Sequence, residues 1–247
     1  MDRIVYTAMT GAKSAFLQQA GVANNLANVS TVGYKAMEHK FRAVPIQGEG
    51  APTRAFVVNA SVADVFDQGP LMATGNPFDV AVDGAGWIAV RAPDGSEAYT
   101  RAGNLRVDPN GILQTASGLS VLSEAGEPIN LPPDNSIAIA PDGTISGVPL
   151  FGNPNSVSLI SRIKLVNPPK NELVRGDDAL FRVRSGEDAA VDPAVRLAPK
   201  SLEGSNVNPA QAMVNMISVA RQFEMQIKML QLADANASRA TQILNVT

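Results

Sequence analysis

The sequence has no cysteine, and it contains one histidine and one tryptophan among 247 residues. The absence of cysteine excludes disulfides, thiolate zinc sites and cysteine nucleophiles. Positive charge is not in excess either, because 20 basic residues stand against 23 acidic ones and the net charge is −3. A long interface with phosphate backbones requires many cations, so the composition argues against nucleic acid as a partner.

Long hydrophobic runs are also missing. No stretch of about 18 apolar residues occurs, so we expect no membrane-spanning helix. Residues 1–13 are interrupted by polar side chains and by Gly11, whereas a secretory signal needs an apolar core of about 7–15 residues. We therefore expect no cleaved signal peptide, and residence outside the cytoplasm would require a dedicated export machine. With 45% hydrophobic residues, the chain should fold around one or two cores.

Apolar residues repeat at helical spacing between residues 4 and 29. They are separated by three, four or seven residues, a spacing that places them on one face of a helix. Gly33 follows this pattern, and glycine commonly adopts the left-handed conformation behind a helix end. We expect the helix to end near residue 30. The stripe consists of Val5, Met9, Ala12, Phe16, Ala23 and Leu26.

A second, longer helix is expected at the C-terminus. Asn208 and Pro209 form its start signal, because asparagine caps a first turn and proline fits the first helical position. A heptad seam then continues almost to the end of the chain. Its residues are Ala212, Met216, Val219, Phe223, Leu230, Ala233, Ala237, Ala240 and Leu244.

Between the two helices the hydrophobic period changes to that of a strand. Phe78, Val80 and Val82 alternate with polar or small residues, and turn signals follow about every ten residues. The predicted turns are Asp83-Gly84, Pro93-Asp94-Gly95, Asn110-Gly111 and Pro141-Asp142-Gly143. We expect an N-terminal helix over residues 1–33, a partly extended connector over 34–75, an antiparallel β domain over 76–200 and a C-terminal helix over 201–247.

The lengths of the two helices indicate that they belong to an assembly. At 1.5 Å per residue they would extend roughly 39 Å and 55 Å, too far to be covered by a modest β domain. Isolated helices are marginally stable in water, whereas burying each Met, Phe or Leu contributes about 1.5–3 kcal/mol. The two apolar faces should therefore pack on each other or on neighbouring molecules, and the sequence leaves both arrangements open.

Candidate catalytic residues are few. His39 is the only histidine, so a Ser-His-Asp or histidine–metal scheme would depend on one residue, and we expect it to be a solvated surface side chain. Ser161 and Lys164 match the spacing of serine acyl-enzymes, but their flanks favour a strand. In a strand, positions three apart point to opposite faces, so the pair cannot act together.

Carboxylates and glycines do not indicate a site either. Asp79 and Asp83 would lie about 13 Å apart on one strand face, beyond the roughly 5–9.5 Å of glycosidase pairs, so we expect both on an exposed face. Gly84 and Gly86 lack the βαβ context of a dinucleotide loop, and the Asp-Gly pairs lack the ligand spacing of a calcium loop. We expect no catalytic residue, no metal and no cofactor.

Several segments carry a family resemblance. Residues 24–36 read NNLANVSTVGYKA, and residues 202–208 read LEGSNVN, followed by MVNMI at 213–217 and RQFE at 221–224. These segments closely resemble the N-terminal and C-terminal signatures of flagellar axial proteins, the rod and hook family. Between them, residues 78–84, 99–101 and 108–111 resemble the β domain that rod and hook proteins share. The resemblance extends over nearly the whole chain.

Within that family, residues 1–9 and the stretch 223–232 are most similar to a proximal rod protein. A distal rod protein is the alternative, and the hook protein fits less well because it normally carries a further outer domain. From another class, a periplasmic glycan-binding protein would need convergent aromatic residues, yet the chain has one Trp and three Tyr.

The resemblance implies an α+β fold, with the N- and C-terminal helices forming a coiled-coil layer around a central antiparallel β domain. It implies a structural subunit and not an enzyme, with itself, the other rod subunits and the flagellar type III export apparatus as partners. Such a subunit is made in the cytoplasm and polymerises into the drive shaft that crosses the periplasm and carries torque from motor to hook. The two apolar stripes would then form the assembly interface.

Overall fold

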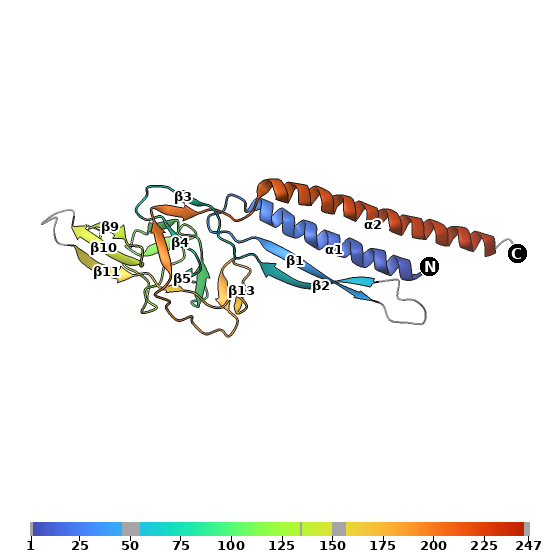
Figure 1. Cartoon of the computed structure of the whole chain (residues 1–247). Helices are drawn as coiled ribbons and strands as arrows, with labels where there is room; N and C mark the ends of the chain where they lie inside the picture. Colours follow the sequence, from blue (N-terminus) through green and yellow to red (C-terminus); the bar gives the residue numbers. More distant parts are fainter. Residues whose placement is uncertain (1, 46–54, 134, 150–156, 245–247) are drawn as a thin grey trace. The chain divides into compact units, whose positions relative to one another are not determined.

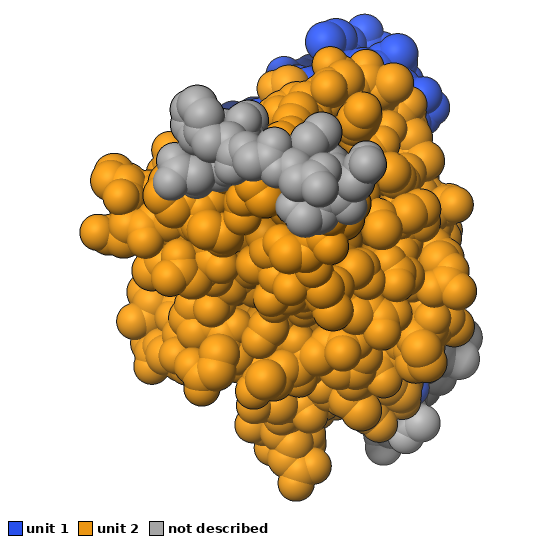
Figure 2. Space-filling view, turned by 90° about the vertical axis from the view of Figure 1, so that its left-hand side faces the viewer, with its two compact units in different colours: residues 1–29, 36–65, 207–247 blue, residues 30–35, 66–206 orange. Residues whose placement is uncertain are grey.

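The computed structural model describes residues 2–45, 55–133, 135–149 and 157–244. A helix lies at each end of the chain, with antiparallel strands between them (Figure 1), which confirms the predicted terminal helices and the central antiparallel strands. The chain divides into two compact units, coloured separately in Figure 2. Unit 1 comprises residues 1–29, 36–65 and 207–247, and unit 2 comprises residues 30–35 and 66–206.

Unit 1 contains the two long helices. Helix α1 spans Asp2–Ala27 and α2 spans Pro209–Leu244, and they lie side by side in opposite directions (Figure 1). The predicted start of α2 is confirmed, because the Asn208 side chain accepts a hydrogen bond from the Gln211 backbone N–H at 3.2 Å. Helix α1 ends slightly before the expected residue 30, and Gly33 has a φ of 69°, as predicted for a residue behind a helix end.

A β-hairpin completes unit 1 and packs along α1 (Figure 1). Its strands are β1 (Met37–Pro45) and β2 (Ala55–Asp64), with a register shift between Lys40 and Phe41. The Asn25 side chain fastens the start of β1 to α1, because it donates to the Met37 carbonyl at 2.8 Å and accepts from the Met37 N–H at 2.9 Å. The hairpin replaces the partly extended connector that the sequence predicts for residues 34–75.

Gly21 is a point of close approach between α1 and β1. A Cβ atom at this position would lie 2.6 Å from Cδ2 of His39, so the absence of a side chain makes room for the imidazole ring. His39 is half-buried, its Nδ1 has no hydrogen-bond partner in the described part of the chain, and its ring stacks on Phe41. The structure therefore corrects the expectation of a solvated surface histidine.

Unit 2 is built from short antiparallel strands. The largest sheet has five strands in the order β12-β5-β6-β14-β13, a second has the order β11-β10-β9, and β15-β4, β16-β3 and β7-β8 form two-stranded pairs. The strands are β3 (Leu71–Ala73), β4 (Val80–Asp83), β5 (Trp87–Arg91), β6 (Glu97–Thr100), β7 (Leu105–Val107), β8 (Leu113–Thr115), β9 (Asn135–Ile139), β10 (Thr144–Pro149), β11 (Ser158–Arg162), β12 (Leu165–Val166), β13 (Leu173–Arg175), β14 (Phe181–Val183), β15 (Arg196–Pro199) and β16 (Ser201–Glu203).

Strand β5 separates two hydrophobic cores of unit 2. Ile88 and Val90 belong to the larger core, whereas Trp87 and Ala89 belong to a second core that also contains Phe181. Successive residues of a strand point to opposite faces, so one strand supplies both cores. The Trp87 and Phe181 rings lie 4.5 Å apart between centroids, a distance at which aromatic pairs add to the stability gained from burial.

The predicted turns of unit 2 are confirmed. Gly84, Gly95, Gly111 and Gly143 all have φ values between 79° and 86°, the left-handed region that glycine adopts without strain. Aspartates before three of these glycines accept hydrogen bonds from the turn. Asp94 bonds to Ser96, Asp108 to the backbone N–H of Ile112, and Asp142 to Thr144.

These hydrogen bonds predict an acid sensitivity. They lower the pKa of Asp94, Asp108 and Asp142, chiefly through the Ser96 hydroxyl, the Ile112 N–H and the Thr144 hydroxyl respectively. A carboxyl group with a depressed folded pKa stabilises above its unfolded pKa of about 3.9, and this contribution disappears as pH falls through the folded value. We expect the free energy of unfolding to drop below about pH 4. Denaturant midpoints measured across pH test this, and an unchanged drop in the triple Asp→Asn variant would contradict it.

The contact of Gly21 with His39 predicts that the effect of Gly21→Ala on stability depends on the residue at position 39. Gly→Ala inside a helix ordinarily stabilises by about 1 kcal/mol, but here the new methyl group would collide with the imidazole ring. We expect Gly21→Ala to destabilise the native chain and to stabilise the His39→Ala variant by about 1 kcal/mol. Denaturant unfolding followed by circular dichroism measures both effects.

Gly11→Ala provides the control for this cycle, because its Cβ would meet the flexible end of Gln226 at 3.0 Å. Its effect should not depend on whether residue 39 is histidine or alanine. If Gly21→Ala stabilises the native chain and the His39→Ala variant equally, His39 of β1 does not pack on Gly21 of α1.

Candidate assembly surface

The residues that α1 and α2 bury inside unit 1 have mostly small side chains. Helix α1 buries Ala8, Ala12 and Ala15, and α2 buries Ala212 and Val219. Small residues allow two helices to approach closely, because interaxial distance depends on the side chains at the contact. The other α2 seam residues are half-buried, and the side chain of Leu244 lies outside those described. The half-buried residues are Met216, Phe223, Leu230, Ala233, Ala237 and Ala240.

Most residues of the predicted α1 stripe are exposed. At about 100° per residue, Val5, Met9, Phe16 and Ala23 share one face of the helix, and that face is exposed; Phe16 is 60% exposed and Met9 is 51% exposed. Of the predicted set, Ala12 is buried and Leu26 is half-buried. Two residues of the α2 seam are therefore buried within the chain and six are half-buried, whereas most of the α1 stripe is exposed.

Large apolar side chains are also exposed on the outer side of α2. We call the exposed large apolar residues of both helices the outer apolar residues. They are Val5, Tyr6, Met9 and Phe16 on α1, and Met213, Val214, Ile217, Met225, Met229 and Leu232 on α2. Soluble monomers rarely expose many large apolar side chains together, and such surfaces typically mark sites of association. These residues form the candidate assembly surface.

Unit 2 contains a buried cluster of three charges. Glu203 is 0% exposed, Lys35 1% and Arg101 4%. Glu203 Oε1 accepts from Lys35 Nζ at 2.6 Å and from the Gly69 N–H at 3.0 Å, while Oε2 accepts from Arg101 Nη1 at 3.0 Å. We refer to Lys35, Arg101 and Glu203 as the charge cluster.

Backbone groups satisfy most of the remaining donors of the charge cluster. Lys35 Nζ donates to the Asp67 carbonyl at 2.8 Å, and Arg101 Nη2 donates to the Gly84 carbonyl at 2.7 Å. The guanidinium group also lies 5.2 Å from the centroid of the Trp87 ring. Burial is the largest effect on the pKa of Lys35 and of Arg101 and lowers both, while the Glu203 carboxylate opposes it.

The charge cluster was not predicted from the sequence, although a signal for it was present. Lys35 and Glu203 lie in the two terminal segments that carry the family resemblance, and Arg101 ends the segment 99–101. Hydrophobic period does not reveal buried charges, because a lysine in a loop reads as a surface residue. The grouping appears when the fold brings together residues separated by 168 positions.

The residues examined for catalysis have structural partners. Ser161 lies in strand β11 as predicted, and Lys164 forms a buried ion pair with Glu97 at 2.7 Å. Asp83 is exposed as expected. Asp79 is buried, which corrects the expectation, because it accepts hydrogen bonds from the Thr74 hydroxyl at 2.6 Å and the Asn76 amide at 3.0 Å.

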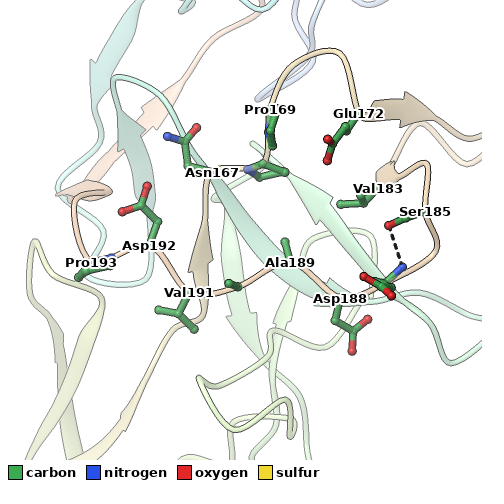
Figure 3. Close-up of a pocket in the computed structure, with 13 residues that line it drawn as sticks. Asn167, Pro169, Glu172, Val183, Ser185, Asp188, Ala189, Val191, Asp192 and Pro193 are labelled. Atoms are coloured by element: carbon green, nitrogen blue, oxygen red, sulfur yellow. Dashed lines mark hydrogen bonds between the residues drawn. The ribbon is translucent and has the colours of Figure 1, made fainter.

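A cavity in unit 2 has a volume of about 410 Å³ (Figure 3). Its lining includes Glu172, Asp188 and Asp192, whose side chains lie apart around the opening in Figure 3. Within the described ranges, no group of three or more His, Cys, Asp or Glu residues is placed to hold a metal ion. In the same part of the chain, no helix is long and apolar enough to cross a membrane.

Three family models match separate parts of the chain. One described as "Flagella basal body rod protein" matches residues 5–35, and one described as "Flagellar hook protein FlgE/F/G D1 domain" matches residues 81–147. A third, "Flagellar basal body rod FlgEFG protein C-terminal", matches residues 198–243. The first and third models cover the two helices, and the second covers strands of unit 2.

Individual relatives match over the full length. The flagellar basal-body rod proteins FlgF of Salmonella typhimurium and Escherichia coli are each 44% identical over 253 residues, covering 100% of this chain and 100% of each relative. The flagellar basal-body rod protein FlgG of Agrobacterium fabrum is 31% identical over 260 residues, covering 96% of this chain and 97% of the relative. The chain therefore belongs to the family of flagellar basal-body rod proteins and is a structural subunit of the rod.

Proposed function

We propose that this subunit polymerises, with copies of itself and with other rod subunits, through the outer apolar residues of α1 and α2. The observation that carries the proposal is the exposure of large apolar side chains such as Phe16, Met9 and Met225 on helices whose other faces are already packed. Burial of each large apolar side chain contributes about 1.5–3 kcal/mol. Their burial between neighbouring subunits would stabilise a polymer without refolding unit 2, whose cores are already closed.

Within this assembly, the two predicted stripes have different roles. The α2 seam, with Ala12 on α1, holds the helix pair together inside one subunit. The exposed part of the α1 stripe, Val5, Met9, Phe16 and Ala23, contacts a neighbouring subunit, and the half-buried Leu26 lies at its end. Helix pairs from successive subunits would then form the coiled-coil layer of the rod, with left-handed packing of the kind that a heptad spacing favours.

We place the subunit in the proximal rod, where it forms part of the drive shaft that transmits torque from motor to hook. The similarity to FlgF over the full chain supports this position, and the lower identity to FlgG makes a distal position the alternative. We further propose synthesis in the cytoplasm and passage through the flagellar export apparatus to the periplasm. Family membership supports this route.

A charge on the exposed α1 face tests the proposal. Phe16→Asp should leave the fold of the free subunit nearly unchanged, within about 0.5 kcal/mol, because this side chain is exposed. It should abolish incorporation into the rod, because assembly would bury an unpaired carboxylate. Swimming in soft agar and the subunit content of purified basal bodies measure the effect. Wild-type motility with normal incorporation would refute the α1 contact.

Two further variants separate assembly from folding. Asn171→Asp introduces the same carboxylate at an exposed polar position of unit 2, outside both helices, and should assemble normally. Phe223→Asp places it at a half-buried seam position, and it should also destabilise the helix pair in the free subunit, as circular dichroism would show. Equal loss of incorporation in all three variants would indicate a general charge effect and not a defined surface.

A further inference from the structure

The charge cluster joins four segments that are distant in sequence. Lys35 ends the segment 30–35, Gly69 lies in the segment leading to β3, Arg101 follows β6, and Glu203 ends β16. All four belong to unit 2, and one carboxylate contacts the other three segments. Glu203 therefore connects the first and last parts of unit 2.

Backbone hydrogen bonds accompany the Glu203 side-chain contacts. The Gly33 N–H donates to the Glu203 carbonyl at 2.8 Å, the Gly204 N–H donates to the Pro70 carbonyl at 2.8 Å, and the Asn206 N–H donates to the Tyr34 carbonyl at 3.3 Å. A side chain at Gly33 or Gly69 would overlap the backbone of the facing segment. The residues that follow α1 and the residues that precede α2 thus meet at this point.

The segments held by Glu203 lie largely outside the hydrophobic cores. The larger core consists of residues between Val80 and Leu197, whereas β16 pairs with β3 in a two-stranded sheet and all three residues of β3 are exposed. Apolar packing maintains the cores, whereas the joined segments are held by the charge cluster, by a few hydrogen bonds and by Arg175, which donates to the Lys35 carbonyl and lies over the Tyr34 ring. Loss of the Glu203 carboxylate should therefore act locally.

We propose that Glu203 is a latch residue: its carboxylate closes unit 2 by tying the segment after α1 to the segment before α2. Because a chain is made from its N-terminus, Lys35 and Arg101 are present 168 and 102 residues before Glu203. Until that carboxylate arrives, closing these segments would bury two cations close together without a counter-ion, which is strongly unfavourable. Within unit 2, the segment after α1 and the segment before α2 are thus joined only when the Glu203 carboxylate is in place.

Hydrogen exchange of the full-length chain, followed by mass spectrometry, tests the latch. Glu203→Gln removes the charge and keeps the shape. We expect the amides of Gly33, Gly204 and Asn206 to exchange about a hundredfold faster or more, while peptides covering β5 and β6 keep their native protection. Local opening with an intact core is the expected signature. Uniformly faster exchange across unit 2, or unchanged exchange at the amides of Gly33, Gly204 and Asn206, would overturn the proposal.

Glu97→Gln is the matched control, because Glu97 is a second buried carboxylate that pairs with a lysine in unit 2. It should accelerate exchange near β6 and Lys164 and leave the amides of Gly33 and Asn206 unchanged. If Glu97→Gln accelerated exchange of those two amides as much as Glu203→Gln does, the loss of any buried charge would loosen the joined segments. That result would overturn the proposal that Glu203 is a latch residue.

A double-mutant cycle tests the counter-ion role itself. Lys35→Met and Glu203→Gln should each accelerate hydrogen exchange at the amides of Gly33, Gly204 and Asn206. In the double variant the acceleration should be far smaller than the product of the two single accelerations, because no buried lysine is left without its counter-ion. Effects that simply multiply would overturn the ion-pair mechanism. Glu203→Asp, a milder variant that keeps the charge, covers the case in which Glu203→Gln does not fold, and it should give intermediate exchange at the same amides.

Discussion

One buried carboxylate, that of Glu203, neutralises two buried cations and so determines how the ends of unit 2 meet. Lys35 and Arg101 sit where water is excluded, and buried charges are tolerated when they are paired and hydrogen-bonded. The same residue receives a backbone hydrogen bond from Gly33. The paths by which the chain leaves α1 and enters α2 therefore depend on one electrostatic arrangement as well as on core packing.

The apolar residues of the helices serve two different contacts. Alanines of α1 and the seam of α2 produce a close helix pair inside the subunit, whereas larger side chains such as Phe16 and Met229 remain on the surface. Small residues favour close approach of fixed elements, and methionine and aromatic side chains suit surfaces that must adapt to a partner. This division fits the proposed assembly, in which small side chains hold the helix pair together within one subunit and the large exposed side chains contact neighbouring subunits.

Local patterns predicted local structure well. The Asn208-Pro209 start of α2, the Asp-Gly and Asn-Gly turns of unit 2 and the alternation around Val80 and Val82 all appear as expected, because each depends on a few neighbouring residues. The burial of Asp79, the position of His39 on Gly21 and the β1–β2 hairpin were not predicted. Each of these depends on a partner that hydrophobic period does not identify.

By itself, the sequence determined that both ends are amphipathic helices, that a β domain lies between them and that the chain resembles flagellar rod proteins, since periodicity and short signatures are local properties. The tertiary structure alone decided which helix face is covered within the subunit, because the α1 stripe of Val5, Met9 and Phe16 and the neighbouring alanine face are both apolar. It also decided that Lys35, Arg101 and Glu203 meet. Long-range contacts of this kind are set by the geometry of the whole fold, and no spacing along the chain encodes them.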